Sequence, residues 1–228
     1  MIDLTATLGD LVTADPRRAR VLEGLGLDYC CHGQRSLGEA AAEAGLDPAE
    51  VAAGLDLPDA PAAGADWRAL GLADLADHVV EVHHTYLWNE MGRLAALADK
   101  VAEVHGGRHP ELAGVRADYR ALKDDLELHL RKEERILFPA IHQLDAAGAP
   151  VGVLGPIRQM ILEHDTAGEL LERLRSATAG YATPDDGCSS YRALMDGLAE
   201  LEADLHEHIH KENNVLFPRA LEADGISA

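Results

Sequence analysis

One segment of this chain occurs twice, and the repetition constrains the fold more than any other feature of the sequence. Residues 129–139 read HLRKEERILFP and residues 208–218 read HIHKENNVLFP, so that the histidine, the lysine and the glutamate match position by position. The segments around His84 and His164 correspond more weakly. A repeated pair of helices predicts a bundle with approximate two-fold symmetry, in which matching residues converge on one core from opposite sides.

Long amphipathic segments predict that the chain is all-α. There are four of them, at residues 72–101, 113–144, 154–178 and 190–222, with glycines and prolines between them. Alanine and leucine are abundant and only 4% of the residues are aromatic, which favours helices over strands. Because such short connections favour antiparallel neighbours, we expect an antiparallel four-helix bundle.

The region before the bundle is predicted to form a small helical domain. The chain then divides into this domain at residues 1–57, a Pro/Ala/Gly linker at 58–66 and the bundle at 67–228. The small domain is expected to hold one helix opened by Pro16, one capped by Ser36 with Glu39, and one started by Asp47. A domain of this size without disulfides is marginally stable, so it is expected to pack on something larger.

Histidines and glutamates lie where the core of the bundle is expected. In the pattern His-x-x-x-Glu, the imidazole and the carboxylate share one face of a helix. That face is the apolar stripe of each repeated segment, and the other two segments carry a histidine in the same kind of stripe. The candidate metal ligands are therefore six residues: His84, His129, Glu133, His164, His208 and Glu212.

These donors favour a site for two metal ions. A carboxylate buried without a partner is strongly unfavourable, so a core that contains several carboxylates and imidazoles needs cations. Two ions bridged by Glu133 and Glu212, with the histidines as terminal ligands, would supply them. Imidazole and carboxylate donors without thiolate suit iron or manganese and disfavour a structural zinc site.

Other polar residues are assigned to supporting or solvent positions. Asp125 and Glu163 lie near the candidate ligands in sequence, and each is a candidate to orient a ligand through a hydrogen bond without binding the metal itself. The Leu-Phe-Pro triplets at 137–139 and 216–218 are expected to serve packing and to mark helix ends. Flank positions are expected for His83, His206, His210 and Glu134, and solvent positions for His32, His78, His105, His109, His142, Asp124, Glu200, Glu202 and Asp204.

The adjacent Cys30 and Cys31 are a separate candidate site. A disulfide between neighbours closes a strained ring, and Gly26 and Gly33 favour a tight turn that presents both sulfurs. Such a pair is suited to binding a soft metal or to exchanging thiols with a partner. The alternative is that both are small half-buried residues. Cys188 lies in a predicted loop and receives no role.

Charge and cysteine content exclude several classes of function. The formal net charge is −20, and so acidic a surface repels phosphate backbones and anionic lipids, so we expect neither a nucleic-acid nor a membrane partner. The start of the chain lacks a signal-peptide pattern. Three cysteines, two of them adjacent, form no disulfide framework. We therefore expect a reducing, cytoplasmic location.

Specific motifs lie along nearly the whole chain. They are DYCC at 28–31, DWR at 66–68, KEE at 132–134, ILFP at 136–139, EHD at 163–165, AGELL at 167–171 and ENNVLFPRAL at 212–221. In these motifs the chain resembles the repair-of-iron-centres (RIC) family, di-iron iron–sulfur cluster repair proteins with a hemerythrin-like domain. His32 is one departure, because it stands where that family usually has the first glycine of Cys-Cys-Gly-Gly.

The resemblance implies a hemerythrin-like bundle with the same six ligands. It implies two iron ions joined by an oxo or hydroxo bridge and by Glu133 and Glu212, with manganese a weaker alternative. The implied function is repair of iron–sulfur clusters damaged by nitric oxide or oxidative stress, by supplying iron. Damaged iron–sulfur proteins are then the partners, and nitric oxide or oxygen species the small ligands. A homodimer through the N-terminal segment is a further hypothesis.

Two other functions stay open. One is an enzyme, a di-iron reductase of nitric oxide or peroxide. The other is a hemerythrin-like binder or sensor of a diatomic gas, although such a binder would have no need of the N-terminal segment. Enzymatic activity is therefore undecided at this point, with the repair or iron-donor function preferred.

Overall fold

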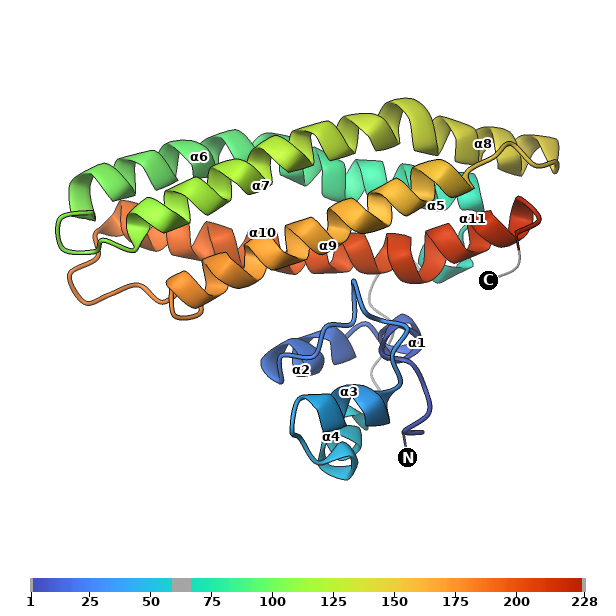
Figure 1. Ribbon diagram of the computed structural model, residues 1–228, viewed down its shortest axis with the longest axis horizontal. Helices are drawn as coiled ribbons and strands as arrows, with labels where there is room; N and C mark the ends of the chain where they lie inside the picture. Colours follow the sequence, from blue (N-terminus) through green and yellow to red (C-terminus); the bar gives the residue numbers. More distant parts are fainter. Residues whose placement is uncertain (1, 59–66, 227–228) are drawn as a thin grey trace.

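The computed structural model describes residues 2–58 and 67–226 of the chain. In the described residues the long segments form an elongated antiparallel four-helix bundle, with a small helical domain against one side (Figure 1). This architecture confirms the predicted fold class. The predicted linker at 58–66 lies outside the described residues except for Pro58.

Each long segment of the bundle is a helical rod, and three of the rods are interrupted by a π-helical turn. In the bundle, α7 packs on α6 and α9, and α6 packs on α10. The short 3₁₀ turn η1 (Trp67–Ala69) precedes the bundle. The rods are α5 (Leu72–Val79), η2 (Val80–His84) and α6 (Thr85–His105); α7 (Leu112–Lys132), η3 (Glu133–Leu137) and α8 (Phe138–Ala147); α9 (Leu154–Ala177); and α10 (Ser189–Lys211), η4 (Glu212–Leu216) and α11 (Phe217–Ala223).

The π-helical turns coincide with candidate ligands. Glu133 opens η3, Glu212 opens η4, and His84 closes η2. A π-turn adds one residue to a helical turn and so changes which side chains face the core, and such turns are frequent at functional sites. A regular α-helical period, from which the helices were predicted, contains no such turns.

The prolines after the repeated motif do not end their helices, which corrects the expectation for the Leu-Phe-Pro triplets. Pro139 and Pro218 lie in the first turn of α8 and α11, where a missing N–H is best tolerated. The helical rod therefore continues through each proline, because the π-turn before it has already broken the regular hydrogen-bond ladder. Phe138 and Phe217, beside them, are buried as expected.

The apolar core of the bundle is divided in two. One cluster joins α6, α7, the end of α9 and α10, and includes Leu94, Leu122 and Leu198. The other joins α5, α8, the start of α9 and α11, and includes Leu75 and Ile157. The candidate ligands are buried polar residues that belong to neither cluster, and on every rod they lie near the point where one cluster ends and the other begins.

The small domain follows the predicted helix signals and adds one helix. Its helices are α1 (Leu8–Ala14), α2 (Arg18–Gly24), α3 (Leu37–Glu43) and α4 (Pro48–Leu55). Ser36 and Glu39 form the predicted capping box, and Asp47 caps α4. Helix α1, capped by Thr7, was not predicted.

The small domain docks on the outer side of α10 and η4, and its cysteine-bearing loop points at the bundle (Figure 1). Ile209 of α10 belongs to the apolar core of the small domain. Asn214 donates to the carbonyl oxygens of Tyr29 at 3.1 Å and Cys30 at 3.2 Å. The small domain is therefore joined to the bundle by a common apolar core and by hydrogen bonds.

At Gly33 this docking leaves no room for a side chain. A Cβ there would lie 2.3 Å from the Tyr29 carbonyl oxygen and 2.5 Å from Asn214 Oδ1. We expect Gly33→Ala to lower the free energy of unfolding by about 1–3 kcal/mol, measured by urea denaturation. Gly24→Ala is the matched control, since a Cβ at Gly24 meets nothing within 4 Å. Equal stability of the two variants would contradict the close approach.

Candidate metal centre

All six sequence-predicted ligands meet in one buried layer of the bundle. They form two groups, and within each group the possible ligand atoms all lie within 4.8 Å of one another. The first group contains His84 and His208, the second contains His129 and His164, and Glu133 and Glu212 belong to both. Residues shared by two neighbouring groups are what bridging ligands require. The side chains come from the π-turn before α6, from α7, α9 and α10, and from the π-turns that follow α7 and α10.

The distances between the donor atoms are those of groups that face a common point. Glu133 Oε2 lies 3.3 Å from Nε2 of both His84 and His129. Glu212 lies 3.1 Å from His164 Nε2, through Oε2, and 3.2 Å from His208 Nε2, through Oε1. Every histidine thus directs its Nε2 atom inwards, toward a carboxylate.

Contacts at the Nδ1 atom, the ring nitrogen that does not face Glu133 or Glu212, hold three of the four histidines in this orientation. The Nδ1 atom of His84 contacts Glu134 Oε1 at 3.1 Å, and that of His129 contacts Glu163 Oε2 at 3.0 Å. The Nδ1 atom of His164 contacts Asn213 Oδ1 at 2.8 Å. A proton on Nδ1 leaves the Nε2 lone pair free, which is the tautomer that a metal ligand needs.

His208 is held by stacking. Its ring lies parallel to that of His83, with centroids 5.4 Å apart and an interplanar angle of 8°. His83 in turn contacts Asp204 Oδ1 through Nδ1 at 2.9 Å and accepts from buried Lys211 at 2.8 Å. The prediction that His83 lies on a flank is therefore wrong. It lies in η2, where the wider π-turn buries His83 and His84 together.

The electrostatics keep both glutamates anionic. Burial raises the pKa of Glu212, but His208 and His164 outweigh it and hold that pKa well below its usual value. Burial also lowers the pKa of His129, while Glu133 and Glu163 raise it to about 10. Without metal, protonated histidine therefore balances the buried carboxylates. Metal binding then releases protons.

The residues present fit a pair of metal ions. Among the described residues, neither carboxylate oxygen of Glu133 has a hydrogen-bond partner, and the same holds for Glu212. The Nε2 atoms of His84 and His208 have none either. Buried polar atoms are normally paired, and these unpaired atoms all point into one layer. Oxygen and imidazole donors without thiolate match iron or manganese. The buried groups thus point to a di-iron type of centre.

Comparison with known proteins agrees with this geometry. The hemerythrin HHE cation binding domain matches residues 75–220, and a domain of unknown function (DUF542, ScdA_N) matches residues 4–58. The iron–sulfur cluster repair protein YtfE of Musicola paradisiaca is 40% identical over 219 residues, 96% of this chain and 97% of that protein. The chain belongs to the YtfE family. This membership confirms the family resemblance predicted from the motifs.

Other YtfE proteins are similar over the same extent. The iron–sulfur cluster repair protein YtfE of Salmonella schwarzengrund is 39% identical over 215 residues, 94% of this chain and 96% of that protein. That of an Escherichia coli strain is 38% identical over 214 residues, again 94% and 96%. Each of these alignments thus spans both the small domain and the bundle.

The two adjacent cysteines of this YtfE-family chain differ in exposure. Cys30 is buried, and a hydrogen bond with Cys31 together with burial raises the pKa of its thiol. Cys31 is half-buried and its sulfur lies 3.6 Å from the carbonyl oxygen of His164. The expected turn that presents both sulfurs is therefore wrong for Cys30. Asp28 joins the two cysteines in a third group with metal-binding spacing.

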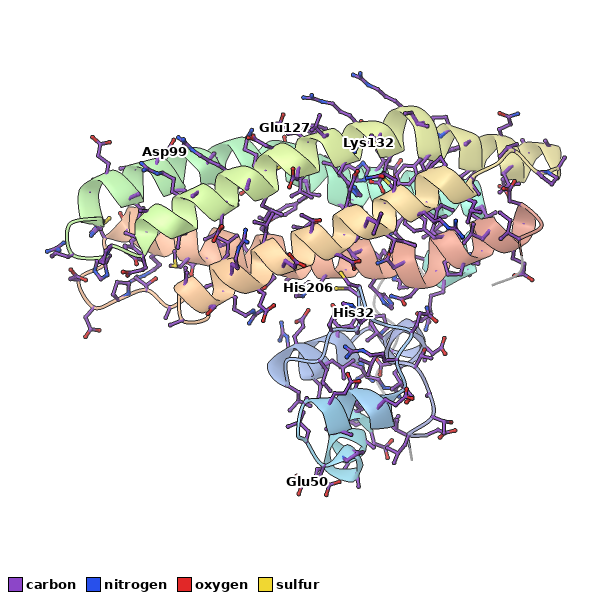
Figure 2. All side chains as sticks on the ribbon, in the orientation of Figure 1. His32, Glu50, Asp99, Glu127, Lys132 and His206 are labelled. Carbon is purple, nitrogen blue, oxygen red and sulfur yellow. The ribbon has the colours of Figure 1, made fainter. Side chains whose placement is uncertain are left out.

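A cavity of about 530 Å³ lies beside the cysteines, between the small domain and helices α9 and α10. Figure 2 shows His32 and His206 at this junction. His32 is exposed, as expected, and contacts Asp28 Oδ2 at 2.6 Å. His206 is half-buried and contacts Glu23 at 3.2 Å. The cavity also receives Asp165 and Glu169 from α9, so its wall is acidic.

Besides His83, three residues expected on flanks or in solvent are buried. His210 is on the outer side of α10 as predicted, but the small domain covers it, and this burial lowers its pKa to about 4. His105 is buried at the far end of α6, and Glu202 is buried in an ion pair with Arg175. Periodicity gives the direction of a side chain, but not what packs on that side.

The residues that orient the ligands were partly foreseen. Glu163 contacts His129 as proposed, and hydrogen bonds from His129, Lys132 and Gln159 outweigh its burial and lower its pKa to about 2. Asp125 is exposed and lines a small pocket beside His129. Glu134 and Asn213, which were missed, both directly follow a shared glutamate, and that position in the repeat is the signal that could have identified them.

Cys188 has the environment of a reactive thiol. It caps α10, is exposed, and lies 3.2 Å from His105 Nε2. Arg108 contacts His105 Nδ1 at 3.4 Å, and because a guanidinium only donates, the ring proton is on Nε2 and faces the sulfur. The hydrogen bond from His105 and the amides of α10 lower the pKa of Cys188 to about 7.

Cys188 alkylation by iodoacetamide should therefore be half-maximal near pH 7 and rise with pH, because the thiolate is the reactive form. The measurement uses mass spectrometry of the peptide that contains Cys188. In His105→Leu the midpoint should move toward about 8.5, the value of an unperturbed thiol. An unchanged midpoint in that variant would show that His105 does not activate the sulfur.

Proposed function

We propose that the six buried residues hold two iron ions. Glu133 and Glu212 would bridge the ions together with an oxo or hydroxo group, and the four histidines would be terminal ligands. The support is that both glutamates belong to both donor groups and carry unpaired oxygens in the described structure. Iron is preferred to manganese because four imidazoles make a site richer in nitrogen than manganese favours. When bound, the pair supplies redox chemistry and exchangeable iron.

The function we infer is repair of iron–sulfur clusters damaged by nitric oxide or oxidative stress, with iron as the cargo. The observation that carries this inference is the position of Cys31, whose sulfur contacts the backbone of ligand His164. A thiol next to the ligand helix can receive an iron ion that leaves the centre. The alignments with proteins named for iron–sulfur cluster repair extend across both domains of this chain. Damaged iron–sulfur proteins are then the partners.

Iron transfer in vitro tests this function. The iron-loaded full-length protein is mixed with a ferredoxin whose cluster has been destroyed by nitric oxide, and recovery of its visible absorbance is followed with sulfide and thiol present. We expect wild type to restore the cluster faster than free ferrous iron does. Cys30→Ser/Cys31→Ser should keep its iron and lose most of this advantage. Cys188→Ser is the matched control and should behave like wild type.

A different result would remove the proposed function. If wild type restores the cluster no faster than free iron, the chain is no iron donor. If the double serine variant restores it at the wild-type rate, the cysteines have no part in transfer.

A reductase of nitric oxide or peroxide is the second candidate, because a small cavity adjoins the ligands. Its volume is about 20 Å³, enough for one water-sized molecule. His129, His164 and His208 line it together with Leu126 and Ile209. Steady consumption of nitric oxide by Cys30→Ser/Cys31→Ser would favour the reductase, since that activity needs only the bundle.

The described structure also bears on membrane association. Within residues 2–58 and 67–226, no helix combines the length and the apolar character needed to cross a bilayer.

A further inference from the structure

The two halves of the internal repeat differ at the residue after each shared glutamate. This residue is Glu134 in the first half and Asn213 in the second, at matching places in the repeated motif. Both side chains present an oxygen to the Nδ1 atom of a candidate ligand, Glu134 to His84 at 3.1 Å and Asn213 to His164 at 2.8 Å. The change from carboxylate to amide therefore needs another explanation.

The amide group gives Asn213 a second contact that a carboxylate could not make. Its Nδ2 atom donates to the carbonyl oxygen of Cys30 at 3.3 Å. A carboxylate only accepts hydrogen bonds, whereas an amide accepts at oxygen and donates at nitrogen. Glu134 accordingly accepts a second time, from Trp88 Nε1 at 2.9 Å. The two partners of Asn213 also fix its orientation, with oxygen toward His164 and nitrogen toward Cys30.

A direct contact also joins the cysteine loop to α9. The sulfur of Cys31 lies 3.6 Å from the carbonyl oxygen of His164, and one turn further along α9 a Cβ at Gly168 would lie 3.5 Å from that sulfur. Asn214 holds the loop as well, through the carbonyls of Tyr29 and Cys30. Of the two asparagines, only Asn213 also contacts a candidate ligand.

We propose that Asn213 is a positioning residue that couples occupancy of the metal centre to docking of the Cys30–Cys31 loop. With metal bound, His164 has one fixed orientation, so the oxygen of Asn213 is held and its amide nitrogen stays on the Cys30 carbonyl. Without metal, the His164 ring keeps its contacts with Asn213 and Glu212 but lacks the bond to the metal, so the clamp on the loop is weaker. The inference rests on the proposed metal centre and is independent of the repair reaction.

Coupling of this kind is reciprocal. If metal favours the docked loop by some factor, the docked loop favours metal binding by the same factor, commonly about 5- to 150-fold. A loop released by a partner protein would then weaken the hold on the metal. The cysteines would thus become accessible at the moment when the centre can give up its iron.

Hydrogen–deuterium exchange of the loop at residues 26–34 tests the coupling on the full-length protein. Exchange is measured without metal and after anaerobic addition of ferrous iron, with metal content determined on the same samples. In wild type we expect iron to slow exchange of the loop by at least about fivefold. In Glu133→Gln, which keeps both cysteines but lacks an intact centre, added iron should leave exchange unchanged.

Variants at position 213 separate the two contacts of the amide. Asn213→Asp keeps an oxygen for His164 but cannot donate to Cys30, so it should bind iron and yet show equal loop exchange with and without it. Asn213→Ala should also lose the coupling, with weaker iron binding. Glu134→Gln is the matched control from the other half of the repeat, and it should retain the coupling.

Two results would overturn the proposal. One is loop exchange in wild type that does not respond to iron although about two ions are bound. The other is a wild-type response in Asn213→Asp or in Asn213→Ala. A wild-type protein that binds no iron refutes the proposed centre itself, and metal content distinguishes that case. Far-ultraviolet circular dichroism identifies a variant that has lost its helices, and the iron response of wild type still decides the proposal.

Discussion

Glu133→Ala is expected to reduce bound iron from about two ions per chain to less than half that amount. The same result is expected for Glu212→Ala. Each glutamate belongs to both groups of donors, so removing one of them takes an anionic ligand from both ions at once. Elemental analysis after gel filtration measures the change. A terminal histidine belongs to one group only, so His84→Ala should lower the content less.

The control for this measurement is Glu103→Ala, which removes an exposed glutamate of α6 and should leave the iron content unchanged. Full iron content in Glu133→Ala would contradict the bridging role. A wild-type protein that retains one zinc ion after purification would contradict the di-iron centre, and the proposed iron donation with it.

Removal of the metal is expected to lower the melting temperature of the wild-type protein by about 10 °C. Glu133 and Glu212 are fully buried, and without metal only the neighbouring histidines balance their charges. A ligand present at a thousand times its dissociation constant stabilises the folded state by about 4 kcal/mol, and 1 kcal/mol shifts the melting temperature of a chain this long by about 2–4 °C. Calorimetry before and after chelation measures the shift.

The double variant Glu133→Gln/Glu212→Gln tests whether the shift comes from this site. Its amides cannot supply the negative charge that holds the ions, so chelation should not change its melting temperature. A shift as large as that of wild type would place the stabilising metal elsewhere, for example at Asp28, Cys30 and Cys31.

The burial of the candidate ligands could be predicted from the sequence because it follows from helix geometry alone. His129 and Glu133 lie one helical turn apart on an amphipathic helix, so any packing of that helix in a bundle brings both side chains to the core. The bundle itself follows from the same pattern. The capping signals of Ser36 and Asp47 are equally local, and the structure contains both.

The burial of His83 and His210 and the contacts of Asn213 could not be predicted from the sequence, because they depend on long-range packing or on an irregular helix. His83 is buried because η2 is π-helical, and a regular α-helical period does not predict such a turn. His210 is buried because the small domain, which lies far earlier in the chain, covers it through Thr13 and Tyr29. Asn213 was read as part of a motif, but its role is visible only once Cys30 is placed beside it.

The division of the bundle core into two clusters has a consequence for how this chain can vary. The clusters share no residue, and the polar layer of ligands lies between them. A substitution in one cluster therefore does not change the residues packed in the other. Each end of the bundle can replace its leucines with other apolar residues independently. The ligand layer differs from both clusters because specific polar side chains from all four rods must lie at one level there, so it separates two apolar cores whose composition can vary independently.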